Sequence, residues 1–155
     1  METRINFLEQ GAALKAMYGL GAYLHKSSIE QPLLHLVSFR VSQINGCAYC
    51  LDMHSKDLRA AGETEQRLYT INTWRETPFF TDRERAAFAW AEAVTKLKDA
   101  EVPDDIFEEA RAHFSEEELV DLTMSVITIN SWNRINIAFR PAVGTYTPGA
   151  HAVRA

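Results

Sequence analysis

The 155 residues are 46% hydrophobic and 24% charged, which is the composition of a globular domain and not of a disordered chain. The formal net charge of -5 argues against non-specific binding to nucleic acid or to an anionic membrane, since both need basic surface. The sequence has neither the apolar core of a secretory leader nor a run of about 18 apolar residues, so we expect a soluble, cytoplasmic protein.

Apolar residues recur at helical spacing along the chain, and capping residues, glycines and prolines separate the helical segments. Two capping boxes, Thr81 with Glu84 and Ser115 with Glu118, mark the beginnings of two helices. The predicted helices cover, in chain order, residues 7–25, from the Ser27-Ser28 cap to 45, 47–61, 65–74, 81–97, 103–113 and 115–138. No segment reads convincingly as a strand. The sequence therefore predicts a single all-α domain, residues 1–155, of about seven helices.

The only two cysteines, Cys47 and Cys50, lie three residues apart, and His54 follows four residues later. Residues three and four apart are neighbours on one helix face, so the three side chains are expected to form one stripe. The Asn45-Gly46 break places Cys47 in the first turn, where free N–H groups and the helix dipole favour a thiolate. A structural disulfide across so short a loop would stabilise the fold little. The spacing therefore indicates thiol chemistry.

In that chemistry one cysteine attacks an electrophile, such as a peroxide oxygen or a disulfide sulfur, and the other resolves the product to a disulfide. Helical spacing alone leaves both thiols as candidates for the attacking group. Two other interpretations stay open. The cysteines could simply fill a helix interface, or they could bind zinc with two further ligands. Those ligands would come from the histidines, which are His25, His35, His54, His113 and His151.

The segment from Ser42 to His54, Ser-Gln-Ile-Asn-Gly-Cys-Ala-Tyr-Cys-Leu-Asp-Met-His, resembles the signature of AhpD-like alkylhydroperoxidases in the carboxymuconolactone decarboxylase superfamily. The resemblance extends over a core of about residues 30–138. It implies an all-helical fold that assembles as a homotrimer or homohexamer. It also implies reduction of hydroperoxides by the cysteine pair, with an external thiol reductant protein as partner and with no cofactor or metal.

The resemblance also implies a role for each residue of the stripe. The cysteine that matches Cys50 becomes the sulfenic acid, and the one that matches Cys47 donates a proton and resolves the disulfide. The histidine that matches His54 belongs to a proton relay. We therefore take Cys47, Cys50, His54 and His35 as the candidate catalytic residues.

His35 enters this set because it is a departure from the pattern. Twelve residues before the first cysteine, where relatives often have a glutamate, this chain has His35. A histidine can shuttle protons near neutral pH, but it lacks the fixed negative charge of a carboxylate. We expect either an altered relay or a substitute acid, such as Glu84 or Glu92.

Two functions outside peroxide reduction remain as alternatives. The first is decarboxylation of a lactone, as in the branch of the superfamily that does not rely on a cysteine pair. The second is a non-enzymatic redox-sensing or zinc-binding oligomer. On the last predicted helix, Trp132, Asn133 and Arg134 are expected to be core and helix-anchoring residues. The competing interpretation is a wall or an anion contact near the thiols, or a subunit contact.

Overall fold

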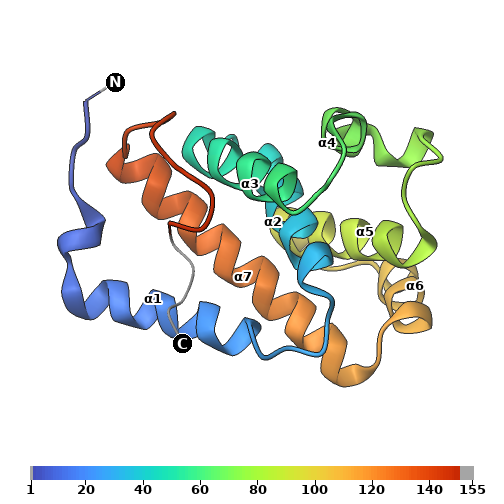
Figure 1. Ribbon diagram of the computed structural model, residues 1–155. Coiled ribbons are helices and arrows are strands. Elements are labelled where there is room, and N and C mark those ends of the chain that lie inside the picture. The colour runs from blue at the N-terminus through green and yellow to red at the C-terminus, as the bar shows by residue number, and fades with distance from the viewer. Residues whose placement is uncertain (1, 151–155) are drawn as a thin grey trace.

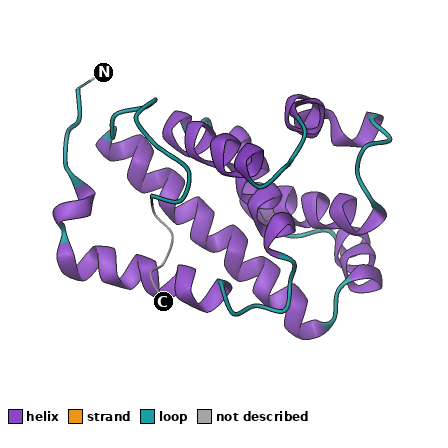
Figure 2. Ribbon diagram, viewed as in Figure 1, coloured by secondary structure: helices purple, strands orange, loops and turns teal. Residues whose placement is uncertain are grey.

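The structure, a computed structural model, describes residues 2–150. Within that range the chain forms seven α-helices, three short 3₁₀ helices and no strand, which confirms the all-α prediction (Figures 1 and 2). The α-helices are α1 (Gly11–Leu24), α2 (Gln31–Asn45), α3 (Ala48–Ala60), α4 (Glu65–Thr70), α5 (Asp82–Lys96), α6 (Asp104–His113) and α7 (Glu116–Phe139). The 3₁₀ helices are Phe7–Glu9, Ile71–Glu76 and Lys98–Ala100.

Most predicted helix ends lie within a few residues of the observed ones, and the exceptions have local causes. The predicted helix 65–74 is an α-helix only as far as Thr70. It continues as the 3₁₀ helix Ile71–Glu76, in which the backbone angles of Thr73 are not helical. The predicted serine cap of α2 is wrong. Glu30 occupies the N-cap position without a side-chain cap, and the Ser27 hydroxyl instead accepts a hydrogen bond from the Ile29 N–H at 3.1 Å.

The longest helix, α7, organises the molecule. It begins at the Ser115 capping box and contacts α1, α2, α3, α5 and α6. Figure 1 shows it crossing the whole molecule, with α1 along one side and α2 and α3 on the other. The buried face of α7 includes Leu122 and Val126, both fully shielded from solvent, and packs into one core with Val37 of α2 and Phe88 of α5. No described helix combines the length and the apolar character needed to cross a membrane.

The segment after α7, residues 141–150, doubles back onto α3. Arg140 takes a left-handed conformation and ends α7. The Lys56 ammonium of α3 then donates to the Gly144 and Tyr146 carbonyl oxygens at 3.3 and 3.1 Å, and the Gly144 N–H donates to the Asp52 carboxylate at 3.1 Å. We call residues 141–150 the C-terminal strap. The strap meets α3 next to the stripe of candidate residues.

Candidate active site

Cys47 and Cys50 are joined by a disulfide at the beginning of α3, with their Cα atoms 5.4 Å apart. Gly46 ends α2 in the left-handed conformation, at a φ of 69°, which most residues with a side chain disfavour. Cys47 then acts as the N-cap of α3, and its sulfur accepts a hydrogen bond from the Cys50 N–H at 3.3 Å. Both cysteines are only 1% exposed, so the pair lies beneath the surface.

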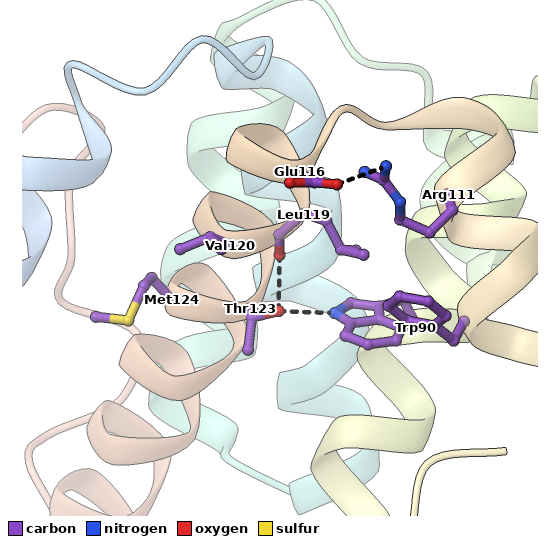
Figure 3. Close-up of a pocket in the computed structure, with 8 residues that line it drawn as sticks. Trp90, Arg111, Glu116, Leu119, Val120, Thr123 and Met124 are labelled. Atoms are coloured by element: carbon purple, nitrogen blue, oxygen red, sulfur yellow. Dashed lines mark hydrogen bonds and ion pairs between the residues drawn. The ribbon is translucent and has the colours of Figure 1, made fainter. Parts of the chain in front are cut away.

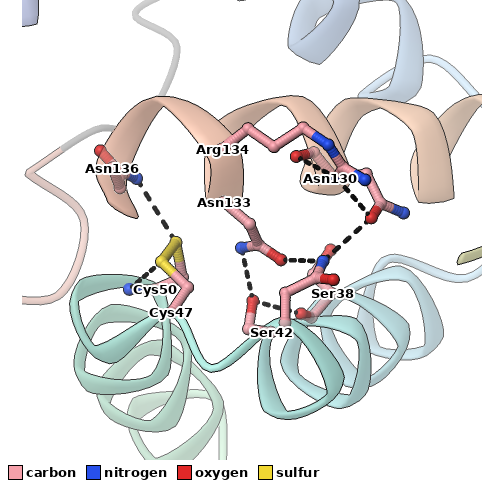
Figure 4. The surroundings of a disulfide bond; sticks show 9 residues. Ser38, Ser42, Cys47, Cys50, Asn130, Asn133, Arg134 and Asn136 are labelled. Carbon is pink, nitrogen blue, oxygen red and sulfur yellow. Dashed lines mark hydrogen bonds between the residues drawn. A yellow bond between two sulfur atoms is a disulfide. The ribbon is translucent and has the colours of Figure 1, made fainter. Parts of the chain in front are cut away.

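The Cys50 sulfur has a second polar neighbour, which comes from α7. The Asn136 side-chain amide donates to Cys50 Sγ at 3.4 Å (Figure 4). Sequence reasoning did not single out Asn136. The available signal was its spacing, because Asn133 and Asn136 are three residues apart and so share one face of α7.

A buried amide network ties the end of α2 to α7 just before the cysteine pair. Asn133, with no exposed surface, donates to the Ser42 hydroxyl at 3.0 Å and accepts from Asn45 at 2.8 Å (Figure 4). Asn45 also donates to Asn130 at 2.9 Å. Arg134 donates to the Asn130 carbonyl and side-chain oxygens of its own helix. Asn133 and Arg134 therefore act as anchors, while the Trp132 ring packs against aromatic rings of the N-terminal segment and α1.

His54 lies one helical turn beyond Cys50, with only 8% of its surface exposed. Neither of its ring nitrogens has a hydrogen-bond partner among residues 2–150. Burial, together with the nearby His35, lowers the pKa of His54 to about 3, so its imidazole is neutral at neutral pH. A buried imidazole with two unpartnered nitrogens can accept or donate a proton to a group that enters the site.

His35 reaches the site from α2, and the centroids of the His35 and His54 rings are 6.3 Å apart. Burial lowers the pKa of His35, while the Asp57 carboxylate acts in the opposite direction. The structure thus brings together all four sequence-predicted residues: Cys47, Cys50 and His54 along α3, and His35 beside them.

Two residues that sequence reasoning missed complete this side of the site. Asp57 lies three residues after His54 on α3, and the Tyr146 hydroxyl donates to its two carboxylate oxygens at 2.8 and 2.9 Å. Burial and this hydrogen bond raise the pKa of Tyr146 to about 12. Asp57 extends the spacing of the stripe by three residues and could have been found from it. Tyr146 carries no such signal, because the strap has no periodic pattern.

The two carboxylates considered as substitutes for the missing glutamate are held elsewhere. Glu84 closes the capping box of α5 and pairs with Arg67 at 2.6 Å. Glu92 accepts hydrogen bonds from Arg40, Trp74 and Arg75, each at 2.9 Å. Burial alone would raise the pKa of Glu92, but these three donors outweigh it and lower the pKa. Both carboxylates therefore serve to join helices.

Over residues 2–150, no group of three or more His, Cys, Asp or Glu side chains is arranged to hold a metal ion. His151, one of the histidines considered as a zinc ligand, lies outside the described residues.

A groove of about 390 Å³ opens on another part of the surface, between α5, α6 and the first half of α7. Figure 3 shows Arg111 paired with Glu116 near the Trp90 ring, whose indole N–H donates to Thr123 at 3.0 Å. Met124 at one end of the groove precedes Asn136 by 12 residues on α7, which corresponds to about 18 Å of helix. The groove is therefore separate from the disulfide.

Comparison with known proteins gives one family. Residues 11–93 match the model of the carboxymuconolactone decarboxylase family. The chain is 42% identical over 139 residues to the uncharacterized protein YdfG of Bacillus subtilis, covering 89% of this chain and 95% of that protein. It is 31% identical over 120 residues to the uncharacterized protein YnjA of Escherichia coli, covering 77% of this chain and 65% of that protein.

Among solved structures, the chain is similar to a protein of unknown function from Agrobacterium tumefaciens, provisionally described as the antioxidant defence protein AhpD. The TM-score is 0.88 at 44% identity, over 94% of this chain and all of that one. A second structure, the debrominase Bmp8, superposes with a TM-score of 0.74 at 22% identity, over 84% of this chain and 70% of that one. At that identity the second likeness concerns the fold.

Proposed function

The chain belongs to the carboxymuconolactone decarboxylase family, and from that membership we propose that it is a thiol-dependent peroxidase that reduces hydroperoxides through Cys47 and Cys50. The observation that carries the proposal is the Cys47–Cys50 disulfide, one helical turn from the buried neutral imidazole of His54. The similarity to the Agrobacterium protein, which is provisionally described as an antioxidant defence protein, also supports this proposal.

In the first step His54 accepts the proton of the Cys50 thiol, and the Asn136 amide stabilises the resulting thiolate through its N–H. The negative sulfur next to His54 raises the pKa of the imidazole, so the proton is retained there. The thiolate attacks the terminal oxygen of the hydroperoxide, and the O–O bond breaks. The alkoxide takes the proton from His54 and leaves as an alcohol, while Cys50 is oxidised to a sulfenic acid.

In the second step the Cys47 sulfur attacks the Cys50 sulfur and the S–O bond breaks. The departing hydroxide combines with the Cys47 proton and leaves as water. The product is the disulfide seen in the structure. An external dithiol protein then reduces it by thiol–disulfide exchange and is itself oxidised, so the cycle needs no bound cofactor.

The proposal extends to the whole chain. Residues 1–155 form one domain of this type, which works in the cytoplasm as a homotrimer or homohexamer. Sedimentation of the purified protein tests the assembly: a monomer at micromolar concentration would contradict it.

The function is tested with the reduced protein, cumene hydroperoxide and a dithiol reductant. Cys50→Ser is expected to abolish peroxide consumption. The matched variant Cys47→Ser is expected to consume about one equivalent of peroxide and to stop at a sulfenic acid, because the resolving thiol is absent. Labelling with dimedone detects that sulfenic acid. Full activity of Cys50→Ser would overturn the proposal.

The wild-type protein and the cysteine variants also test the two alternatives, lactone decarboxylation and zinc binding. Turnover of carboxymuconolactone by the double serine variant would indicate the lactone reaction. Stoichiometric zinc in protein purified without chelator, lost in both cysteine variants, would indicate a metal site.

A further inference from the structure

A proton held by the His35 and His54 imidazoles would be stabilised by a negative charge nearby. Position 35 does not supply that charge, because it holds a histidine and not a glutamate. His54 is buried whereas His35 keeps part of its surface exposed, and their ring centroids lie 6.3 Å apart. A proton on either ring therefore repels a proton on the other, which is one cause of the lowered pKa of His54. A relay of two imidazoles works better with an anion beside it, because the anion stabilises the protonated ring.

Asp57 is the acidic residue in position to provide that charge. It follows His54 by three residues, so the two side chains share a face of α3. The Asp57 carboxylate also acts electrostatically on His35, across the gap between α3 and α2. It therefore acts on His35 and shares a helix face with His54, whereas Glu84 and Glu92 are bound to arginines elsewhere.

Tyr146 fixes the direction of that carboxylate. Its hydroxyl is shared between the two Asp57 oxygens at 2.8 and 2.9 Å, and the Gly149 N–H approaches one of them at 3.4 Å. Tyr146 is only 8% exposed. The strap that carries it is attached separately, through Lys56 and Asp52. The hydrogen bonds of the strap thus hold the acid in place from outside α3.

We infer that Asp57, oriented by Tyr146, is the positioning carboxylate of this site, in place of a glutamate on α2. The inference rests on the proposed thiol chemistry. The proton that leaves the Cys50 sulfur is held by the His54–His35 pair, where Asp57 stabilises its positive charge. The same proton returns to the departing alkoxide, so Asp57 itself exchanges none. The C-terminal strap is then a working part of the site.

Within residues 2–150, the other ionisable groups near the site carry no net charge that acts on the two imidazoles. On α3, Asp52 pairs with Lys56 at 2.9 Å, which leaves that couple neutral overall. Burial and the neighbouring Tyr18 and Asp52 raise the pKa of Tyr49, so this side chain is uncharged at neutral pH. From α7, Asn136 faces the sulfur without charge.

The test uses the reduced full-length protein and two measurements that need no peroxide. One is the NMR titration of the His35 ring, and the other is the pH dependence of Cys50 alkylation by iodoacetamide. In Asp57→Asn the His35 pKa is expected to fall by about one unit, and alkylation at pH 7 to slow by about tenfold. Asp57→Glu, which keeps the charge, is expected to restore most of both effects.

Asp52→Asn is the matched control. It removes a carboxylate of α3 that also holds the strap, through Gly144, but that leaves Asp57 and Tyr146 intact. Because it loosens the strap without removing the charge at position 57, it is expected to shift both measurements by much less than Asp57→Asn. Tyr146→Phe is expected to shift both in the same direction as Asp57→Asn, but by less.

An unchanged His35 titration in Asp57→Asn, or an equal shift in Asp52→Asn, would overturn the inference. If Asp57→Asn does not fold, an unchanged His35 titration in Tyr146→Phe has the same force. If instead the wild-type protein consumes no hydroperoxide while the titrations behave as expected, the proposed function fails and the positioning role stands.

Discussion

At the scale of single residues, the surroundings of the Cys50 sulfur favour its negative form. The Asn136 amide donates to the sulfur at 3.4 Å, and Cys50 itself lies in the first turn of α3, at the positive end of the helix dipole. A donor to the charged form of an acid lowers its pKa, and a hydrogen bond to a charged group contributes about 1.5–3 kcal/mol. Asn136 is therefore expected to make Cys50 more reactive.

Replacement of Asn136 tests this. Asn136→Leu keeps the branched shape of the side chain and removes the donor, so the pKa of the reduced Cys50 thiol is expected to rise. Alkylation at pH 7 is expected to slow by about tenfold, which corresponds to one pKa unit. The control on the same helix is Ser131→Ala, since that hydroxyl only donates to the Ile127 carbonyl at 2.9 Å. Identical pH profiles for Asn136→Leu and wild type would contradict the assignment.

At the scale of elements, the junction between α2 and α3 determines where the cysteines lie. The sequence predicted this junction correctly from Asn45-Gly46, because a left-handed helix end is a local property that glycine favours. The sequence was wrong about the serine cap of α2 and about the length of α4, and both errors have a non-local cause. There the choice between Ser27 and Glu30, or between an α-helix and a 3₁₀ helix at Thr73, follows tertiary packing that local patterns do not contain.

Replacement by alanine is expected to change the free energy of unfolding in opposite directions at Gly46, in the junction, and at Gly21, inside α1. Gly46 has a φ of 69°, whereas Gly21 lies within α1, and a Cβ added at either would meet no atom within 4 Å. Gly46→Ala is therefore expected to lower the free energy of unfolding by about 1–2 kcal/mol through backbone strain alone. Gly21→Ala is expected to raise it by up to about 1 kcal/mol, through helix propensity. Urea titration measures both, and a change of the same sign in the two variants would contradict this account.

At the scale of the whole molecule, the site is assembled from segments far apart in the sequence. Spacing within α3 was enough to align Cys47, Cys50 and His54, since a helix fixes the neighbours of each residue. Asn136 and Tyr146 were out of reach, because no periodicity states which face of α7 meets α3 or where an irregular strap returns. The all-α fold was predictable because helix caps and apolar periodicity depend only on residues that are close together in the sequence.

The lowered pKa values of His54 and His35 make the stability of the whole molecule depend on pH. His54 has an ordinary pKa of 6.5 when unfolded and of about 3 in the fold, and burial lowers the pKa of His35 as well. Below pH 6.5 the unfolded chain therefore binds protons that the folded protein does not, so acid favours unfolding. For His54 the free energy of unfolding falls by up to about 1.4 kcal/mol per pH unit.

The range from pH 6.5 to 5 isolates this effect. Carboxyls whose pKa the fold lowers, such as Glu92 and Glu118, have an ordinary pKa of 4.5, so they lose their contribution only at lower pH. The free energy of unfolding of the oxidised protein, from urea titrations at several pH values, is expected to fall steadily over this range. His54→Gln is expected to reduce that slope, and His54→Gln with His35→Gln to remove most of it. A slope that is equal in wild type and in the double variant would mean that the two imidazoles bind protons in the fold as readily as in the unfolded chain, which would contradict the lowered pKa of His54.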